Sequence, residues 1–114
     1  MRKPQHKQIP VPPLLSKLPD HPRQLFTLTH NRNPAAHLSD ILERPRVAIV
    51  GSRKMTAYGR LVTEQLAEDI AGRGAVIISG LAYGVDVCAH RAALKVNGLC
   101  IVVQANGLDQ LYPT

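Results

Sequence analysis

The chain contains no tryptophan, and Phe, Tyr and Trp together make up only 4% of its 114 residues. Aliphatic side chains must therefore build the core. A hydrophobic fraction of 45% is ordinary for a folded protein and argues against overall disorder. No apolar run approaches the ~20 residues that span a bilayer, and residues 1–8 lack the apolar block of a signal peptide. We therefore expect one small cytoplasmic protein with no membrane partner.

Cysteine is also scarce. The two that occur, Cys88 and Cys100, form no CxxC pair and belong to no cluster with metal-ligand spacing. Both lie in apolar surroundings, so we expect them to be reduced core residues. The sequence predicts neither a metal site nor a cofactor.

Several motifs of catalytic and nucleotide-binding proteins are missing. Residues 51–59 lack G-x-G-x-x-G, and Ser79 stands where a dinucleotide-binding strand would end in an acidic residue. No Gly-Lys-Ser/Thr is present, which disfavours a Walker P-loop. His90 is the only histidine beyond residue 45 and has no clear nucleophile beside it. These absences disfavour NAD-dependent, ATP-hydrolysing and triad chemistry, and we predict no catalytic residues.

The formal net charge is +6, which makes nucleic acid a natural partner. Residues 1–45 carry seven Lys and Arg against three Asp and Glu, whereas residues 46–114 carry seven against five. A surplus this small is also typical of an ordinary solvated surface. Charge therefore permits nucleic-acid binding without establishing it.

The composition changes near residue 45. Residues 1–22 hold six of the nine prolines, which predicts an extended, poorly ordered basic arm or one that packs loosely across the domain. The main domain then covers residues 23–114. Within it, residues 25–29 favour a short edge strand, and residues 34–42 favour a short helix that Pro45 ends.

A clear α/β pattern begins at residue 46. Residues 47–50, 76–79 and 99–103 are short apolar runs without alternation, as expected of strands covered on both faces. A helix capped by Thr56 or Ser52 runs to about residue 73, and one capped by Asp86 runs to about residue 96, where Asn97 and Gly98 end it. The order predicts a Rossmann-like parallel sheet with right-handed crossovers and helices on both faces. In the first helix, we expect a stripe of four residues to face the core: Tyr58, Val62, Leu66 and Ile70.

Three strands are fewer than the five or six of a complete doubly wound sheet. Either the N-terminal segment and a partner complete the sheet, or the chain is the front portion of a longer protein. We favour the second interpretation.

Ligands of open parallel sheets bind at the carboxyl ends of the strands. Three Gly-rich or small-polar loops lie there, at residues 51–56, 80–86 and 104–109. Glycine allows close backbone approach, and a helix N-terminus suits a phosphate. The first loop adds cationic and hydroxyl side chains, which suit a phosphodiester oxygen. The predicted DNA- or phosphate-binding residues are Gly51, Ser52, Arg53, Lys54, Thr56, Gly59 and Gly80.

These residues also have structural interpretations. Ser52, Thr56 and Asp86 are all suited to capping helices, and Arg53 is suited to an exposed surface. His90 lies one helical turn after Asp86, which favours a structural hydrogen-bonded pair over an acid–base dyad. Two other side chains, Tyr58 and Tyr83, are suited to stacking on bases, although core packing is favoured for Tyr58.

Five blocks occur together in the sequence: Val47-Ala-Ile-Val-Gly-Ser-Arg53, Thr56-Ala-Tyr-Gly59, Ser79-Gly-Leu-Ala-Tyr-Gly-Val-Asp86, Ala89-His-Arg-Ala-Ala-Leu94 and Gly107-Leu-Asp-Gln-Leu-Tyr-Pro113. In this order and spacing they resemble the DNA-processing protein A family (DprA, also called Smf). The resemblance covers residues 46–113 and extends to the stretch before Pro45. It implies an extended Rossmann-like fold that continues beyond residue 114.

The resemblance implies a function as well. Family members bind single-stranded DNA in natural transformation, protect incoming strands, load a RecA-type recombinase and act as homodimers. The Gly-Ser-Arg block contributes to the family's DNA pocket, which carries over to Gly51, Ser52 and Arg53. An alternative hypothesis is a nucleotide-binding or nucleotide-processing enzyme with a similar fold. The Pro-Gly-Gly-x-Gly-Thr loop of phosphoribohydrolases, which would support that alternative, is missing.

Overall fold

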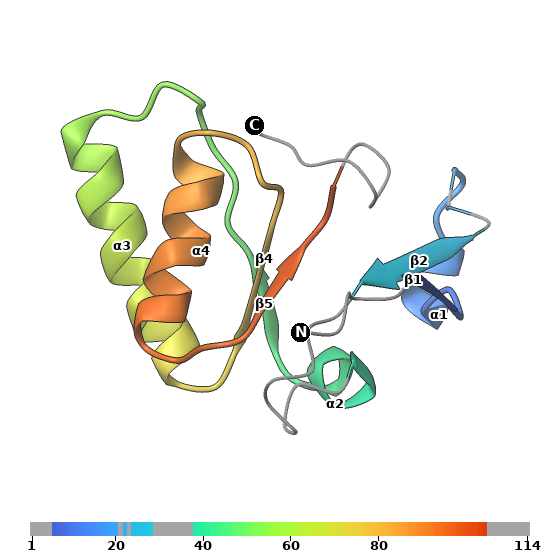
Figure 1. Ribbon diagram of the computed structural model, residues 1–114. Coiled ribbons are helices and arrows are strands. Elements are labelled where there is room, and N and C mark those ends of the chain that lie inside the picture. The colour runs from blue at the N-terminus through green and yellow to red at the C-terminus, as the bar shows by residue number, and fades with distance from the viewer. Residues whose placement is uncertain (1–5, 21, 23, 29–37, 105–114) are drawn as a thin grey trace. The chain divides into compact units, whose positions relative to one another are not determined.

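The computed structural model describes residues 6–20, 22, 24–28 and 38–104 (Figure 1). The chain divides into two compact units, Met1–Asn33 and Pro34–Thr114. Among the described residues, no helix is long and apolar enough to cross a membrane.

The first unit is a small antiparallel hairpin with one helical turn. Its elements are β1 (His6–Ile9), α1 (Pro13–Ser16) and β2 (Leu25–Leu28), and β1 pairs with β2 so that Ile9 lies opposite Leu25. Pro13 suits the first position of α1, where its missing N–H has no partner to lose. The predicted strand is confirmed at Leu25–Leu28, whereas residue 29 lies outside the described residues. The segment predicted as an arm, residues 1–22, contains β1 and α1, and its boundary and its poor order stay predictions.

The second unit has the predicted α/β order, and Figure 1 shows its parallel sheet beside two long helices. Its sheet has the strand order β3-β4-β5 with all neighbours parallel, and Ile77 pairs with both Val47 and Cys100. This confirms a partial Rossmann-like fold with three core strands. Residues 34–37 of the predicted short helix lie outside the described residues, and its remainder forms α2. The elements are α2 (Leu38–Glu43), β3 (Arg46–Ala48), α3 (Ala57–Gly72), β4 (Val76–Ser79), α4 (Val85–Lys95) and β5 (Cys100–Val102).

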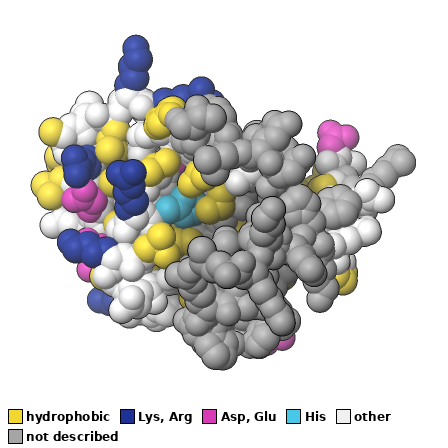
Figure 2. All heavy atoms as spheres, viewed as in Figure 1, with side chains coloured by type: hydrophobic (Ala, Val, Ile, Leu, Met, Phe, Trp, Pro, Cys, Tyr) yellow, Lys and Arg dark blue, Asp and Glu magenta, His cyan; other side chains and the backbone are white. Residues whose placement is uncertain are grey.

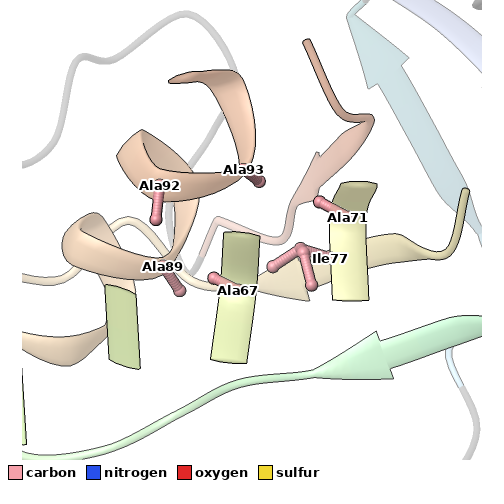
Figure 3. Packing of buried hydrophobic residues seen from close by; sticks show 6 residues of the cluster. All are labelled: Ala67, Ala71, Ile77, Ala89, Ala92 and Ala93. Atoms are coloured by element: carbon pink, nitrogen blue, oxygen red, sulfur yellow. The ribbon is translucent and has the colours of Figure 1, made fainter. Parts of the chain in front are cut away.

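Both long helices pack on the same face of the sheet. Alanines of α3 and of α4 belong to one buried cluster with Ile77 of β4 (Figure 3). The prediction of helices on both faces is therefore wrong for α3 and α4. The reason is the strand order: successive crossovers of one hand that step in one direction across a sheet place their helices on the same side.

Small side chains build this core. The buried cluster contains five alanines and one isoleucine. Among the described residues, the largest side chains that are fully buried are those of Ile77 and Val76. Alanine lets the two helices approach each other and the sheet closely. The cluster consists of Ala67, Ala71, Ile77, Ala89, Ala92 and Ala93.

Each long helix ends in the same hydrogen-bonded motif. After α4, Asn97 has a φ of 58°, the N–H of Gly98 donates to the carbonyl of Ala93 at 2.8 Å, and that of Asn97 donates to Leu94 at 3.0 Å. This is a Schellman motif, which satisfies the last carbonyls of the helix. After α3, Gly74 takes the left-handed position with a φ of 94°. The predicted helix ends are thereby confirmed.

Only part of the predicted apolar stripe of α3 faces the core: Val62 and Ile70 are half-buried, and Ile70 packs against the buried cluster. Tyr58 is 76% exposed and Leu66 is 52% exposed, whereas Thr63, Ala67 and Ala71 are buried. The prediction that Tyr58 packs in the core is therefore wrong. A helical stripe of large apolar residues indicates a buried face only when the partner surface has room for them, and this interface is fitted to alanine.

Both cysteines are free, with Cys88 buried and Cys100 half-buried, which confirms the prediction of reduced core residues.

Burial raises the pKa of the Cys100 thiol to about 11. A raised thiol pKa means less thiolate at any given pH, so we expect Cys100 to react with iodoacetamide at pH 8 about a hundredfold more slowly than an unhindered thiol. Mass spectrometry of a labelling time course measures this rate. Labelling of Cys100 in the folded chain at the rate seen in 6 M guanidinium would contradict the prediction.

Candidate nucleic-acid interface

The carboxyl ends of the three parallel strands lie side by side. The N–H of Ile49 donates to the carbonyl of Ile78 at 3.0 Å, and that of Val103 donates to Ser79 at 2.9 Å. The buried hydroxyl of Ser79 donates to the carbonyl of Ile49, which joins the end of β3 to β4. The loops that leave β3 and β4 therefore begin next to each other, as expected for ligand-binding loops of an open parallel sheet.

The first loop is an exposed turn with unused donors. The N–H of Lys54 donates to the hydroxyl oxygen of Ser52 at 3.0 Å, which closes a small side-chain turn around Arg53. Within the described part of the chain, the backbone N–H groups of Gly51, Ser52 and Arg53 donate to no protein acceptor. Gly51, Ser52, Arg53 and Lys54 are all exposed residues, so this segment combines three unused N–H groups with two exposed cationic residues. An anion is the natural ligand of such donors.

Thr56 caps the helix that follows this loop. Its side-chain oxygen accepts a hydrogen bond from the N–H of Gly59 at 2.9 Å, so of the two predicted caps, Thr56 and Ser52, Thr56 is the N-cap of α3. The structural role predicted for Thr56 is thus present, and Gly59 lies in the first helical turn beside it. The first turn of α3 contains no acidic residue, so the partial positive charge of this helix end is not offset by a carboxylate of its own.

The second loop supports the first through Gly84. This glycine has a φ of 87° and a ψ of −130°, and a Cβ placed on it would lie 2.2 Å from the carbonyl oxygen of Ser52. The next residue, Val85, donates its N–H to that oxygen at 3.2 Å, and its side chain packs on Gly51. The backbone of Gly84 therefore rests directly on the backbone of Ser52 and Arg53. Sequence reasoning named this turn only as Gly-rich and did not assign Gly84 a role.

The surroundings of Gly80 differ from those of the first loop. Asp86 is buried in the first turn of α4, and a Cβ on Gly80 would lie 2.8 Å from its carboxylate oxygen. The prediction that Asp86 caps α4 is wrong, because the N-cap residue is Gly84 and no side chain caps this helix. An acidic residue in the first turn still offsets the positive end of α4. The loop at Gly80 is therefore less suited to an anion than residues 51–54, and the binding role predicted for Gly80 stays a prediction.

The buried histidine is used to hold this loop. The Nε2 of His90 lies 2.9 Å from the carbonyl oxygen of Gly80, and because a carbonyl only accepts, Nε2 is the donor. The predicted hydrogen bond between His90 and Asp86 is not formed, since His90 reaches back to the end of β4 instead. With His90 only 5% exposed, this pair is not arranged as a solvent-facing acid–base dyad. Residues 105–109 of the third predicted loop lie outside the described residues.

Comparison with known proteins identifies the family of the chain. The model of the family described as DNA recombination-mediator protein A matches residues 4–114. The chain belongs to this family. Protein Smf of Escherichia coli (strain K12) is 38% identical over 118 residues, an alignment that covers 99% of the chain and 29% of that relative. DNA processing protein DprA of Bacillus subtilis (strain 168) is 44% identical over 68 residues, covering 60% of the chain and 23% of the relative. The chain thus spans less than a third of these two recombination-mediator relatives.

Solved structures of the family share the fold. DNA processing protein A of Helicobacter pylori, a structure concerned with its single-stranded DNA binding mode, matches with a TM-score of 0.80 and 34% identity. That match covers 96% of the chain and 47% of the other protein. DprA of Streptococcus pneumoniae matches with a TM-score of 0.60 and 43% identity, over 65% of the chain and 26% of the other. The chain therefore shares the fold of part of each of these two proteins.

Proposed function

We propose that this chain binds single-stranded DNA through phosphates held at residues 51–54, and that it acts by binding rather than by catalysis. One observation carries the proposal: the unused N–H groups of Gly51, Ser52 and Arg53 lie beside two exposed cations at the start of α3. Backbone N–H groups with a guanidinium form charge-assisted hydrogen bonds to phosphate oxygens. Contacts of this kind position a strand without reading its sequence, so base preference is slight.

The relatives support the same proposal. The family is described as a recombination mediator, and the Helicobacter pylori protein, which is 34% identical, binds single-stranded DNA. We extend the proposal to the finer role that the resemblance implies. In natural transformation the full-length cytoplasmic protein, as a homodimer, protects incoming strands and passes them to a RecA-type recombinase.

The test is a fluorescence-anisotropy titration of labelled oligothymidine with this chain and its Arg53→Ala variant. Loss of one charge-assisted phosphate contact costs about 1.5–3 kcal/mol, so we expect the variant to bind roughly ten- to a hundredfold more weakly. Arg73→Ala is the matched control, because Arg73 is an exposed arginine at the opposite end of α3. This control should lose little affinity.

A duplex of equal length is titrated in parallel at two salt concentrations. The proposal predicts tighter binding of the single strand at both. If the two arginine variants bind alike, or duplex and single strand bind equally, the basic charge of the chain merely attracts DNA and residues 51–54 are not the site.

A further inference from the structure

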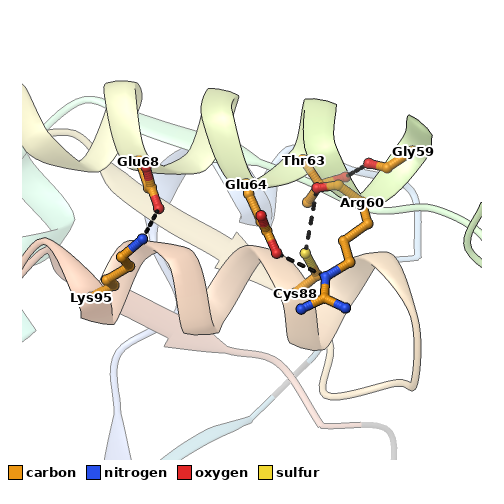
Figure 4. Close-up of polar contacts among 7 residues, drawn as sticks. All are labelled: Gly59, Arg60, Thr63, Glu64, Glu68, Cys88 and Lys95. Carbon is orange, nitrogen blue, oxygen red and sulfur yellow. Dashed lines mark hydrogen bonds and ion pairs between the residues drawn. The ribbon is translucent and has the colours of Figure 1, made fainter. Parts of the chain in front are cut away.

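A groove runs between α3 and α4 on the side of the helices away from the sheet, with a cavity volume of about 590 Å³. This size is within the range of pockets that hold small ligands. On α3 its wall is formed by Arg60, Glu64 and Glu68, which follow each other at four-residue spacing. On α4 the lining residues are likewise separated by helical turns, with Val87, Arg91 and Lys95 in one row. Figure 4 shows the α3 side chains directed toward α4.

One end of this groove opens at the proposed phosphate loop. Met55, Tyr83 and Gly84 line that end, and Met55 directly follows Lys54 in the chain. Gly84 lines the groove and also contacts the proposed phosphate loop, because its backbone rests on that of Ser52. A strand whose phosphate lies at residues 51–54 therefore has its neighbouring nucleotide at the mouth of the groove.

Charges in the groove are paired except at one position. The Nε of Arg60 lies 2.9 Å from the Oε1 of Glu64 on the same helix, α3. The Nζ of Lys95 on α4 lies 3.2 Å from the Oε1 of Glu68 on α3 (Figure 4). Within the described residues, Arg91 makes no ion pair although it lines the groove between these two pairs. Over α3 and α4, Figure 2 shows basic and acidic side chains interleaved. Arg91 is thus the cation left for a ligand.

The groove also offers apolar and aromatic surface. Tyr83 is 53% exposed at the mouth, and the lining of α4 includes Val87, Cys88 and Ala92. Burial raises the pKa of the Cys88 thiol, so this side chain is neutral at physiological pH. An exposed aromatic ring, an apolar floor and one unpaired guanidinium are the groups that bind a base together with its phosphate.

We propose that this groove takes one nucleotide of the bound single strand, with its base stacked on Tyr83 and its phosphate on Arg91. The proposal rests on the function proposed for residues 51–54, because it places the nucleotide adjacent to the phosphate held there. Stacking accepts every base, so the site adds affinity for single strands over duplex, whose bases are not free to enter. The phosphate contacts at residues 51–54 position the strand, and stacking of its free base in the groove adds to the preference for a single strand.

The test uses oligothymidine with one 2-aminopurine, whose fluorescence falls on stacking, and the variants Tyr83→Leu, Tyr83→Phe and Arg91→Gln. We expect Tyr83→Leu to bind roughly tenfold more weakly and to lose the fluorescence change, and Tyr83→Phe to retain both. Arg91→Gln should lower the slope of log affinity against log salt by about one phosphate contact. Matched controls are Tyr58→Leu, an exposed tyrosine outside the groove, and Arg73→Gln; neither should change binding.

A second measurement changes the DNA instead of the protein. A strand with abasic residues in place of thymidine should bind the unmodified chain more weakly, and Tyr83→Leu should then cause no further loss. If Tyr83→Leu and Arg91→Gln bind like the unmodified chain while Arg53→Ala binds weakly, the groove proposal is overturned and the proposed function stands. If Arg53→Ala also binds normally, the proposed function itself fails. Equal losses in Tyr58→Leu and Tyr83→Leu would likewise overturn the groove proposal.

Discussion

Replacing Gly84 with alanine is expected to destabilise the second unit severely and to abolish DNA binding. Gly84 has a φ of 87° and a ψ of −130°, and side-chain-bearing residues rarely adopt such a backbone. That strain alone costs about 1–3 kcal/mol. The added Cβ would also lie 2.2 Å from the carbonyl oxygen of Ser52 and 2.8 Å from that of Arg53, so backbone must move. We expect a total loss above roughly 4 kcal/mol in the free energy of unfolding, measured by urea titration.

Gly72→Ala is the control for this prediction. Gly72 is the last residue of α3, and a Cβ there meets nothing within 4 Å. Because alanine favours the helix and restricts the unfolded chain, we expect a change between zero and a gain of about 1 kcal/mol. A Gly84→Ala variant as stable as Gly72→Ala, with unchanged affinity for oligothymidine, would show that Gly84 does not support the loop at residue 52.

The second large effect is expected for Ile77→Ala. Ile77 is fully buried and is the only large side chain in a cluster otherwise made of alanines. Removing it leaves a cavity that the short neighbours on α3 and α4 cannot fill. Substitutions of this kind cost about 2–5 kcal/mol, and the small neighbouring side chains place this one toward the upper end. Thermal melting followed by far-ultraviolet circular dichroism measures the loss.

Two further variants test the reason for this effect. Ile77→Val removes a single methyl group and should cost only about 0.5–1.5 kcal/mol. Ile78→Ala removes the same atoms one residue later, where the side chain points to the other face of β4 and is half-buried, so a smaller loss is expected. Equal losses at positions 77 and 78 would mean that the alanine cluster is not the centre of stability.

The strands and helices of the second unit were predictable because their signals are local. The apolar run that forms β4 ends at Ser79. Thr56 has a side chain that can cap a helix, and the pair Asn97-Gly98 is typical of a helix C-terminus. Each of these features depends on neighbouring residues, so the sequence displays it directly. The side of the sheet on which a helix packs has no such local signal, because it depends on the order of the strands.

The errors on α3 have a related cause. Tyr58 and Leu66 have the spacing of a buried stripe, yet Ala67 and Ala71 form the interface, because the opposing helix presents alanines at the same height. Hydrophobicity ranks leucine and tyrosine above alanine, whereas close helix packing requires the smaller side chain. Which requirement prevails is decided by residues 89–93, far away in the sequence.

The candidate site was predictable in part. The loop with Ser52 and Arg53 follows directly from strand-to-helix connectivity and from donor chemistry. The contact between Gly84 and Ser52 joins residues 32 positions apart and needs backbone coordinates to be seen. Tyr83 and Arg91 come to line one groove only because α3 and α4 lie side by side. The sequence signal that could have indicated this groove is the four-residue spacing of charged residues on both helices.

The strand order β3-β4-β5 is also the order in which a ribosome releases these segments. When β4 leaves the exit tunnel, its partner β3 is already outside, and β5 then finds β4 in place. Paired residues are separated by about 30 positions between Val47 and Ile77 and by about 23 between Ile77 and Cys100. Loop closures of this length cost little more entropy than shorter ones. The sheet can therefore grow one strand at a time during synthesis, and the loop at residues 51–56 meets its Gly84 support as soon as the start of α4 emerges.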